Sequence, residues 1–428
     1  KVINHHQEVP FRVLERKYSF DESGQHNEDN GSENMIIRGD NLEALKALLP
    51  RYEGRIKCIY IDPPYNTGNE GWVYNDNVND PKIKKWLGEV VGKEGEDLTR
   101  HDKWLCMMYP RLKLLQKLLA DDGVIFISID DTECSNLILI CNEIFGASNF
   151  VANVSWQRTY SPRNDSKGIV SEVEHLVVFS KNPGWQPNKL PRTEAMDSRY
   201  KNPDNDVAPW KSSDAFAPGA ATHQGMVYAI QHPFTGEMLY PSNGRCWRYQ
   251  QSSMLEYMQG WCNYRLENLH DEKERARVCG IDESAVRKDV LAIVLEEPLE
   301  VSAAKAQKVY NRGRWPGFYF TKGGYGGIAR KTYLENVGGR LPTNLWMYEE
   351  TGHTDEAKKE LISLFGGRSP FDTPKPTRLL DFVLKVAGTS ETLMLDSFAG
   401  SGTTAHAVLN ANKADNGNSH FILIEMMD

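Results

Sequence analysis

The segment that constrains the architecture most is LMLDSFAGSGT at residues 393–403. Three apolar residues form a short strand, Asp396 ends it, and the glycines at 400 and 402 make a turn before a helix over 403–410. Glycines in such a turn let the backbone approach a ligand closely, although a strand–helix turn can also be purely structural. A strand that passes into a helix through this turn predicts an α/β fold.

Apolar strands and amphipathic helices alternate over much of the remaining chain. Working outward, we predict strands at residues 35–38, 58–61, 124–129, 150–156, 175–180 and 421–424. We predict helices at 42–49, 103–120, 132–145, 355–365 and 378–387, a charged loop at 66–100 and a turn at 121–123. Strands that are apolar throughout and alternate with helices predict a parallel, doubly wound sheet, completed by the strand pair 150–156 and 175–180.

The middle of the chain has a different composition. From about residue 183, proline, glycine, asparagine and aromatic residues become frequent, and only residues 283–297 have a helical pattern. We therefore predict an irregular inserted domain. The expected organisation is a polar N-terminal segment at 1–34, a first half of the α/β domain at 35–182, the insert at 183–345, and a second half of the α/β domain at 346–428.

Composition narrows the class of protein further. The chain has 428 residues and a formal net charge of −8, which argues against a protein that coats nucleic acid through bulk charge but allows a local basic face. The seven cysteines include no CxxC pair, so a zinc knuckle is excluded and reduced thiols in a cytoplasmic protein are expected. No apolar run approaches the ~20 residues of a membrane span. Nothing near His101 or His353 completes a metal site, so we predict none.

A second motif, Asp62-Pro63-Pro64-Tyr65, follows the strand at 58–61. Ligands bind at the carboxyl ends of strands in open α/β sheets. The two prolines fix the backbone and remove two donors, which leaves carbonyl acceptors beside the carboxylate of Asp62. Such a group of acceptors suits an amino group that donates two hydrogens, and the ring of Tyr65 suits a planar base. The alternative is a rigid turn without function.

An acidic residue also ends the last predicted strand. Glu425 follows residues 421–424 and lies 23 residues after Gly402. An acid at this distance from a glycine-rich turn suits the ribose hydroxyls of a nucleoside cofactor. Alone, it would more simply be a solvated strand end, but together with the turn it favours cofactor binding.

These motifs resemble those of the amino-group DNA methyltransferases. Residues 62–65 match their DPPY catalytic motif, residues 396–402 resemble their S-adenosylmethionine (SAM) motif, and the order of the two motifs is that of the permuted beta group. The longer match at residues 60–68, with Tyr74-Asn75-Asp76 after it, resembles the modification subunits of Type III restriction–modification systems. The resemblance covers most of 35–180 and 345–425. It implies a circularly permuted, Rossmann-like methyltransferase sheet with a target-recognition domain at 183–345.

The resemblance also implies residue roles. Asp62 and the Pro63 carbonyl would hold the target amino group, with Pro64 shaping the turn and Tyr65 stacking on the flipped base. The SAM-binding residues would be Asp40, Phe371, Thr373, Lys375, Pro376, Asp396, Phe398, Gly400, Gly402, Thr403 and Glu425. Asp40 could instead cap a helix, and the segment 371–376 could be a proline-rich linker.

Basic and aromatic residues alternate in two parts of the insert, residues 245–249 and 311–331. This pattern is typical of nucleic-acid surfaces, although a solvated loop face over a small aromatic core would look similar. The candidate DNA contacts are Arg245, Arg248, Arg312, Arg314, Lys322, Arg330 and Lys331.

Together these features predict a SAM-dependent enzyme that methylates the N6 amino group of adenine in double-stranded DNA after base flipping. The resemblance implies a homodimer and a restriction subunit as partners. The absence of a Pro-Cys dipeptide removes the cytosine ring-carbon methyltransferases. Three alternatives stay open: an N4-cytosine methyltransferase, which usually has Ser in place of Asp62; a protein-glutamine methyltransferase, in which the cofactor motif comes first; and a DNA-specificity subunit without catalysis.

Overall fold

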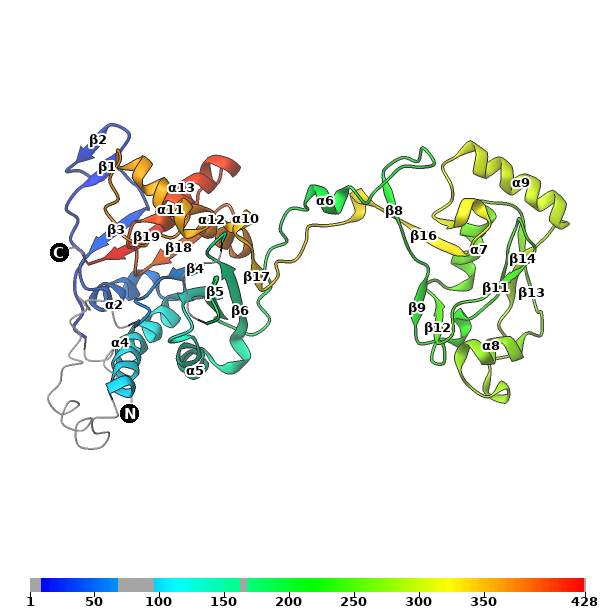
Figure 1. The fold of residues 1–428 in the computed structure, drawn as a ribbon, viewed down its shortest axis with the longest axis horizontal. Helices are drawn as coiled ribbons and strands as arrows, with labels where there is room; N and C mark the ends of the chain where they lie inside the picture. The colour runs from blue at the N-terminus through cyan, green and yellow to red at the C-terminus, as the bar shows by residue number, and fades with distance from the viewer. Residues whose placement is uncertain (1–8, 68–95, 162–167, 427–428) are drawn as a thin grey trace. The chain divides into compact units, whose positions relative to one another are not determined.

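The computed structural model describes residues 9–67, 96–161 and 168–426 (Figure 1). The chain divides into two compact units, one formed by Lys1–Leu190 with Leu341–Asp428 and the other by Pro191–Arg340. The second unit is narrower than the predicted insert, 183–345. The reason is packing: Leu190 is buried in the core of the first unit, and the strand at Leu345–Trp346 pairs with its sheet.

An eight-stranded sheet forms the centre of the first unit, in the order β17-β6-β7-β5-β4-β18-β19-β3. Its strands are β3 (Met35–Arg38), β4 (Ile56–Ile61), β5 (Leu119–Ile129), β6 (Phe150–Gln157), β7 (Val173–Ser180), β17 (Leu345–Trp346), β18 (Leu393–Asp396) and β19 (His420–Glu425). Every pairing is parallel except that β7 runs antiparallel to both β5 and β6. The sheet is therefore mixed, and the prediction of a parallel sheet is wrong at β7. β6 and β7 are consecutive antiparallel neighbours, a pairing that needs no crossover helix.

Helices cover both faces of this sheet. α2 (Asn41–Tyr52), α4 (Glu96–Leu118) and α5 (Cys134–Phe145) pack on one face, in a core that includes Ile59 and Ile61 of β4. α12 (Thr377–Ala387) and α13 (Thr403–Asp415) pack on the other face, in a core that includes Cys58 and Tyr60. Alternate residues of one strand thus enter opposite cores, as the pleat requires.

Smaller elements complete the first unit (Figure 1). They are the hairpin of β1 (Ser19–Asp21) and β2 (Gly24–His26), a 3-10 helix of one turn at Ala147–Asn149, and the helices α10 (Tyr348–Thr351) and α11 (Thr354–Leu364). The turn predicted at 121–123 lies inside β5, where the register against β4 shifts between Ile56 and Cys58. The helix predicted over 103–120 begins at Glu96, and of the loop predicted at 66–100, residues 68–95 lie outside the described ranges.

The second unit is regular, contrary to the prediction of an irregular domain. It contains a four-stranded sheet (β11-β10-β14-β13), a three-stranded sheet (β15-β16-β8) and a two-stranded sheet (β12-β9). The strands are β8 (Trp210–Asp214), β9 (Phe216–Pro218), β10 (Ile230–Gln231), β11 (Met238–Leu239), β12 (Arg245–Trp247), β13 (Tyr264–Glu267), β14 (Ala292–Leu295), β15 (Phe318–Phe320) and β16 (Ile328–Tyr333). The helices are α6 (Glu194–Asp197), α7 (Gln251–Gln259), α8 (Glu272–Cys279) and α9 (Leu299–Arg312), with single 3-10 turns at Gln224–Met226, Glu283–Ala285, Lys322–Gly324 and Leu334–Asn336.

The helix predicted at 283–297 is wrong. Residues 292–295 are four consecutive buried apolar residues and form the interior strand β14. A short apolar run of this kind does not distinguish a strand from a buried helix. The helix α9 begins only after Pro298, which is its N-cap residue. In the described part of the chain, no helix is both long and apolar enough to cross a membrane.

Candidate active site

The two sequence motifs meet at one edge of the sheet. Asp62 follows β4, Asp396 ends β18 and Glu425 ends β19, and these three strands are parallel neighbours. Their carboxyl ends therefore lie together although β4 and β18 are more than 300 residues apart. This is the edge at which open α/β sheets bind ligands.

Lys375 contacts the carboxylate of Asp62 directly. Its Nζ atom donates hydrogen bonds to Oδ1 and Oδ2 of Asp62 at 2.8 and 2.7 Å. The same atom donates to the hydroxyl oxygen of Tyr65 at 2.9 Å and lies 5.1 Å from the centroid of the Tyr65 ring. The resemblance predicted a cofactor contact for Lys375, whereas its ammonium lies at the DPPY turn.

Glu174 is a second carboxylate at this site, and the sequence analysis missed it. The Tyr65 hydroxyl lies within hydrogen-bonding distance of both Asp62 Oδ1 (2.9 Å) and Glu174 Oε2 (3.0 Å). Arg158 donates to Glu174 Oε1 at 2.9 Å, and Lys375 Nζ lies 3.6 Å from Glu174 Oε2. Glu174 is buried on β7. The available signal was an acid inside a mainly apolar strand, because buried carboxylates need partners.

Burial and the neighbouring charges shift the protonation equilibria of this cluster. Burial raises the pKa of Asp62 above its usual value, against the opposing effect of Lys375. Burial alone would lower the pKa of Lys375, but the negative charges of Asp62 and Glu174 raise it overall. The pKa of Tyr65 is also raised well above its usual value, mainly by burial and then by Asp62. Lys375 is therefore an ammonium ion beside a carboxylate whose ionised form depends on it.

A buried hydrogen-bond network fixes the DPPY turn. Asn66 has a positive φ of 62° and donates to Glu133 Oε1 at 2.5 Å. His101 Nδ1 lies 2.5 Å from the same oxygen, and Trp104 Nε1 donates to the Pro64 carbonyl at 2.7 Å. The turn is thus fixed from α4 and from the start of α5. The residues Tyr74-Asn75-Asp76 of the longer motif lie outside the described residues.

The glycine-rich turn is built around two carboxylates. Asp396 Oδ1 accepts from the Phe398 amide at 3.0 Å, and Oδ2 accepts from the Thr404 hydroxyl at 2.6 Å. Burial raises the pKa of Asp396 to about 7. Glu425 Oε2 accepts from the Gly400 amide at 2.6 Å, which links the ends of β18 and β19.

The predicted cofactor residues surround this turn. Gly400 and Gly402 have positive φ values of 51° and 78°, and a Cβ on Gly400 would lie 2.9 Å from the ring of Phe371. The Thr403 hydroxyl donates to the Lys375 carbonyl at 3.2 Å, Pro376 caps α12, and Thr373 is exposed. The positive φ favours glycine at position 400, and any side chain there would also require the Phe371 ring to move.

Asp40 caps α2, as the alternative interpretation of its motif predicted. Its Oδ1 atom accepts from the amides of Leu42 and Glu43 at 2.9 and 3.0 Å. The next residue, Asn41, donates to the Ser397 carbonyl at 3.1 Å and accepts from Arg111 at 2.6 Å. These bonds connect the start of α2 to the glycine-rich turn.

The residues at this turn fit a nucleoside cofactor. The Ser397 hydroxyl is buried without a hydrogen-bond partner among the described residues. The glycines place no side chain of their own on the backbone at the start of α13, and an acid ends each of the two adjacent strands. A helix start, close backbone approach and a strand-end acid are the features that bind such cofactors.

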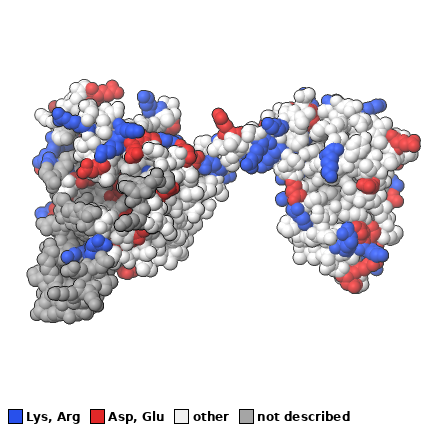
Figure 2. All heavy atoms as spheres, in the orientation of Figure 1, with Lys and Arg blue, Asp and Glu red and all other residues white. Residues whose placement is uncertain are grey.

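The candidate DNA contacts of the second unit differ in exposure. Arg248, Arg312, Arg314 and Lys322 are exposed. Arg245 forms an ion pair with Asp214 at 2.6 Å, and the half-buried Arg330 lies 3.4 Å from the Tyr249 hydroxyl. On the face drawn in Figure 2, acidic and basic side chains are interspersed among uncharged ones.

Lys331 is a structural residue, and its prediction as a DNA contact is wrong. Its Nζ atom is fully buried and donates to Asp204 at 2.6 Å, to Asp206 at 2.5 Å and to the Trp315 carbonyl at 2.8 Å. It also lies 4.9 Å from the centroid of the Trp210 ring. With all of its donors used inside the protein, Lys331 cannot reach a phosphate.

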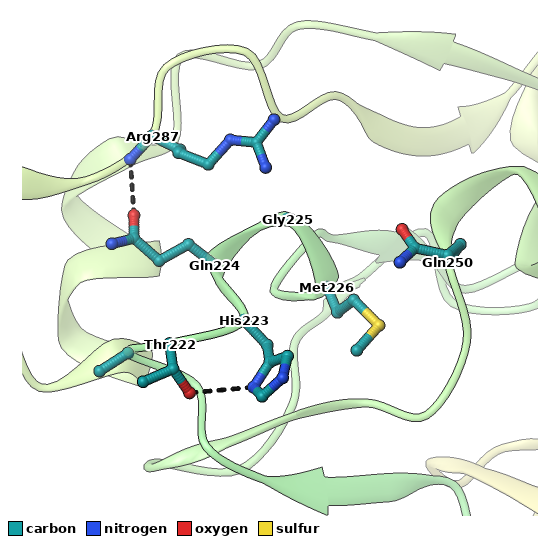
Figure 3. Close-up of a pocket in the computed structure, with 8 residues that line it drawn as sticks. Thr222, His223, Gln224, Gly225, Met226, Gln250 and Arg287 are labelled. Atoms are coloured by element: carbon teal, nitrogen blue, oxygen red, sulfur yellow. Dashed lines mark hydrogen bonds between the residues drawn. The ribbon is translucent and has the colours of Figure 1, made fainter.

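A separate cavity of about 280 Å³ lies in the second unit (Figure 3). Its lining includes His223, Gln224, Gln250 and Arg287, and the Arg287 amide donates to Gln224 Oε1 at 2.7 Å. None of the residues predicted from sequence lines it. Among the described residues, no three potential metal ligands gather into a group.

Comparison with known proteins identifies the family. A family model described as DNA methylase matches residues 56–428. The Mod subunit of the Type III restriction-modification enzyme StyLTI from Salmonella typhimurium strain LT2 is 33% identical over 408 residues, covering 92% of this chain and 53% of that protein. The EcoPI Mod subunit from Escherichia phage P1 is 30% identical over 434 residues, covering 94% and 58%. The Type II methyltransferase M.KpnI from Klebsiella pneumoniae is 28% identical over 404 residues, covering 93% and 81%.

The chain thus spans a little over half the length of the two Mod subunits. Among solved structures, the cytosine-N4-specific DNA methyltransferase PvuII aligns at 12% identity with a TM-score of 0.39. The alignment covers 92% of this chain and 83% of the PvuII chain. The family model includes the DPPY turn, the glycine-rich turn and the unit between them. The chain therefore belongs to the N6/N4 DNA methylase family.

Proposed function

We propose that this protein transfers a methyl group from S-adenosylmethionine to the N6 amino group of adenine in double-stranded DNA. The observation that carries the proposal is the position of Asp62 at the end of β4, beside the glycine-rich turn at the end of β18. A group bound at one turn is therefore next to a group bound at the other. Asp at position 62, where the N4-cytosine enzymes usually have Ser, favours adenine.

The residues of the DPPY turn supply acceptors for the target amino group. An exocyclic amino nitrogen is a poor nucleophile because its lone pair is delocalised into the ring. Hydrogen bonds to the Asp62 carboxylate and the Pro63 carbonyl favour a pyramidal nitrogen with a localised lone pair. The Tyr65 ring would stack on the base, which must leave the duplex to reach a pocket at the strand ends. The chain thus acts through positioning and electrostatics.

The glycine-rich turn would hold the cofactor. We assign Asp396, Phe398, Gly400, Gly402 and Glu425 to this role, with Phe371 closing one side and Asp40, Thr373, Pro376 and Thr403 nearby. When bound, the cofactor supplies an electrophilic methyl group on a sulfonium sulfur. The chain's own contribution is to exclude water and to keep the amino nitrogen facing that group.

The second unit is proposed to read the DNA sequence as a target-recognition domain inserted into a permuted methyltransferase. Exposed Arg248, Arg312, Arg314 and Lys322 support this role, since arginine and lysine contact phosphates and base edges. The cavity lined by Gln224, Gln250 and Arg287 adds amide and guanidinium groups of the kind that bind bases. Arg245 and Arg330 remain candidates, and DNA would have to replace their present contacts with Asp214 and Tyr249.

Assembly is also a proposal. The Mod subunits that match this chain belong by name to Type III restriction-modification enzymes. We therefore propose a homodimer that works with a restriction subunit. Sedimentation of the protein alone, and then with a candidate restriction subunit, would test each association separately.

The direct test of function is to map methylated bases in DNA from cells that express the full-length gene. Methyl groups at N6 of adenine in one short sequence are the expected result. Methyl groups at N4 of cytosine would show that the protein is an N4-cytosine methyltransferase instead. Specific DNA binding without any methylation would select a specificity subunit.

A further inference from the structure

Lys375 uses all of its hydrogen-bond donors at the proposed catalytic site. An ammonium has three protons, and Nζ contacts three acceptors, namely both oxygens of Asp62 and the hydroxyl of Tyr65, at 2.7–2.9 Å. The side chain is only 11% exposed. These are the contacts of a fixed ion pair rather than of a solvated lysine.

The ammonium therefore stands where a target amino group would have to bind. Both are nitrogen donors that need the acceptors of Asp62. Oδ1 already accepts from Lys375 and lies 2.9 Å from the Tyr65 hydroxyl, so its two lone pairs are engaged. Oδ2 accepts from Lys375 alone, but an amino nitrogen that faced both oxygens of this carboxylate would have to lie where Nζ now lies, within 2.8 Å of each.

A second anion is within reach of the same lysine. Glu174 Oε2 lies 3.6 Å from Lys375 Nζ, and Arg158 holds the other carboxylate oxygen at 2.9 Å. Both carboxylates lie within hydrogen-bonding distance of the single Tyr65 hydroxyl proton, which can serve only one of them at a time. The cluster thus offers the ammonium two anionic positions, one at Asp62 and one at Glu174.

We propose that Lys375 is a positioning residue that occupies the place of the target amino group on Asp62 and moves to Glu174 when the base enters. This inference rests on the proposed function. In the empty site the lysine keeps Asp62 paired. On base entry Glu174 receives the ammonium, and the Asp62 carboxylate accepts hydrogen bonds from the neutral amino group instead, so neither carboxylate is left without a hydrogen-bond partner, which would be costly.

The first experiment measures base capture with duplex DNA that carries 2-aminopurine at the mapped target adenine, because its fluorescence rises when the base leaves the stack. Glu174→Gln removes the second anion and should raise the protein concentration for half-maximal fluorescence roughly tenfold. The double variant Glu174→Gln/Lys375→Met no longer has a lysine to displace and should return to within about threefold of the wild type.

The surface pair on α12 provides matched controls. Asp381 and Lys385 form an i,i+4 ion pair with side chains 30% and 55% exposed. Asp381→Asn and Lys385→Met should leave base capture unchanged. SAM affinity, measured by calorimetry on every variant, reports that the first unit is folded. An equal loss from Glu174→Gln with and without Lys375 would overturn the exchange.

The second experiment is the pH profile of kcat/KM for methyl transfer. The titratable groups that face Asp62 are Tyr60 on β4, Tyr65 in the same turn, Glu174 on β7, Lys375 before α12 and Asp396 on β18. Lys375 favours the ionised form of Asp62 and Glu174 opposes it. Lys375→Met should therefore shift the acidic side of the profile (the acid limb) to higher pH by at least about one unit. Glu174→Gln should shift it to lower pH.

The two proposals fail in different ways. If wild-type protein transfers no methyl group to adenine at any mapped site, the proposed function fails. If the wild type is active but the two variants move the acid limb in the same direction or not at all, the lysine exchange fails while the function stands. Opposite movements show that both side chains act on Asp62, and the base-capture experiment then separates exchange of the lysine from a fixed ion pair.

Discussion

Two buried lysines, Lys375 in the first unit and Lys331 in the second, show how similar ion pairs serve different ends. Each ammonium is held by carboxylates and lies near an aromatic ring. Lys331 is fully buried among acceptors that come from the interior of its own unit. Lys375 is 11% exposed and lies at the edge of the sheet where the two motif-bearing turns meet. Access to a ligand-binding edge, rather than the ion pair itself, distinguishes a candidate functional residue from a structural one.

Replacing Lys331, the structural lysine of the two, should have the largest effect, a loss of stability. Lys331→Met leaves Asp204 and Asp206 without their buried cation and should destabilise the second unit by about 3–5 kcal/mol. Chemical denaturation followed by the fluorescence of its buried tryptophans measures this. The control Lys305→Met removes a half-exposed lysine that pairs with Glu297 in the same unit. A loss of stability no greater than the control's would contradict the structural role.

The second lysine, Lys375, pairs with Asp62. Asp62→Ala should lower methyl transfer by about 10²–10³-fold, the usual effect of removing one electrostatic contact to the reacting group. SAM affinity should largely survive, because the glycine-rich turn is unchanged. Tritium transfer to DNA and calorimetry give the two values, with Asp381→Ala as the surface control. Near-normal methyl transfer would show that Asp62 does not contact the target amino group.

A smaller effect is expected at the cofactor turn. Glu425→Ala should weaken SAM binding by about 1.5–3 kcal/mol, the contribution of a hydrogen bond to a charged group. DNA affinity without cofactor should change little. Calorimetric titration with SAM measures the change, and an unaltered dissociation constant would show that Glu425 only joins β19 to the Gly400 amide.

The smallest effect is expected from the exposed arginines of the second unit. Arg312→Ala should remove one phosphate contact and lower the slope of log affinity against log salt by about one unit. Its matched control is Arg277→Ala, an exposed arginine paired with Glu274 on α8. Fluorescence anisotropy at several salt concentrations measures both. Identical slopes for the two variants would place the DNA surface elsewhere.

Local sequence was sufficient for the two turns. Asp62 and Asp396 each end an apolar strand, and the residues after them allow only a tight turn, so both positions followed from the printed sequence. The adjacency of β4 and β18 came from the family resemblance, since no local pattern connects segments so far apart. The helix predicted at 283–297 was wrong because a short apolar run, residues 292–295, has no distinguishing period, and α9 was not predicted.

Side-chain direction explains the errors in the site. Arg330 and Lys331 are neighbours in β16, so they point to opposite faces, and only a register could tell which one is buried. Glu174 was overlooked because a single acid in a strand has no spacing signal. The partners that make it part of the site, Tyr65 and Arg158, come from other segments.

The order of the central strands also determines when the site can exist during synthesis. β18 and β19 fill the space between β4 and β3, yet they are synthesised after the whole second unit. Until then the nascent chain has two unpaired strand edges, while residues 191–340 can already fold as a unit. The DPPY turn after β4 consequently acquires the glycine-rich turn as its neighbour only after residues 393–425 have been made. A polypeptide that stops early has a folded second unit but no assembled site for chemistry.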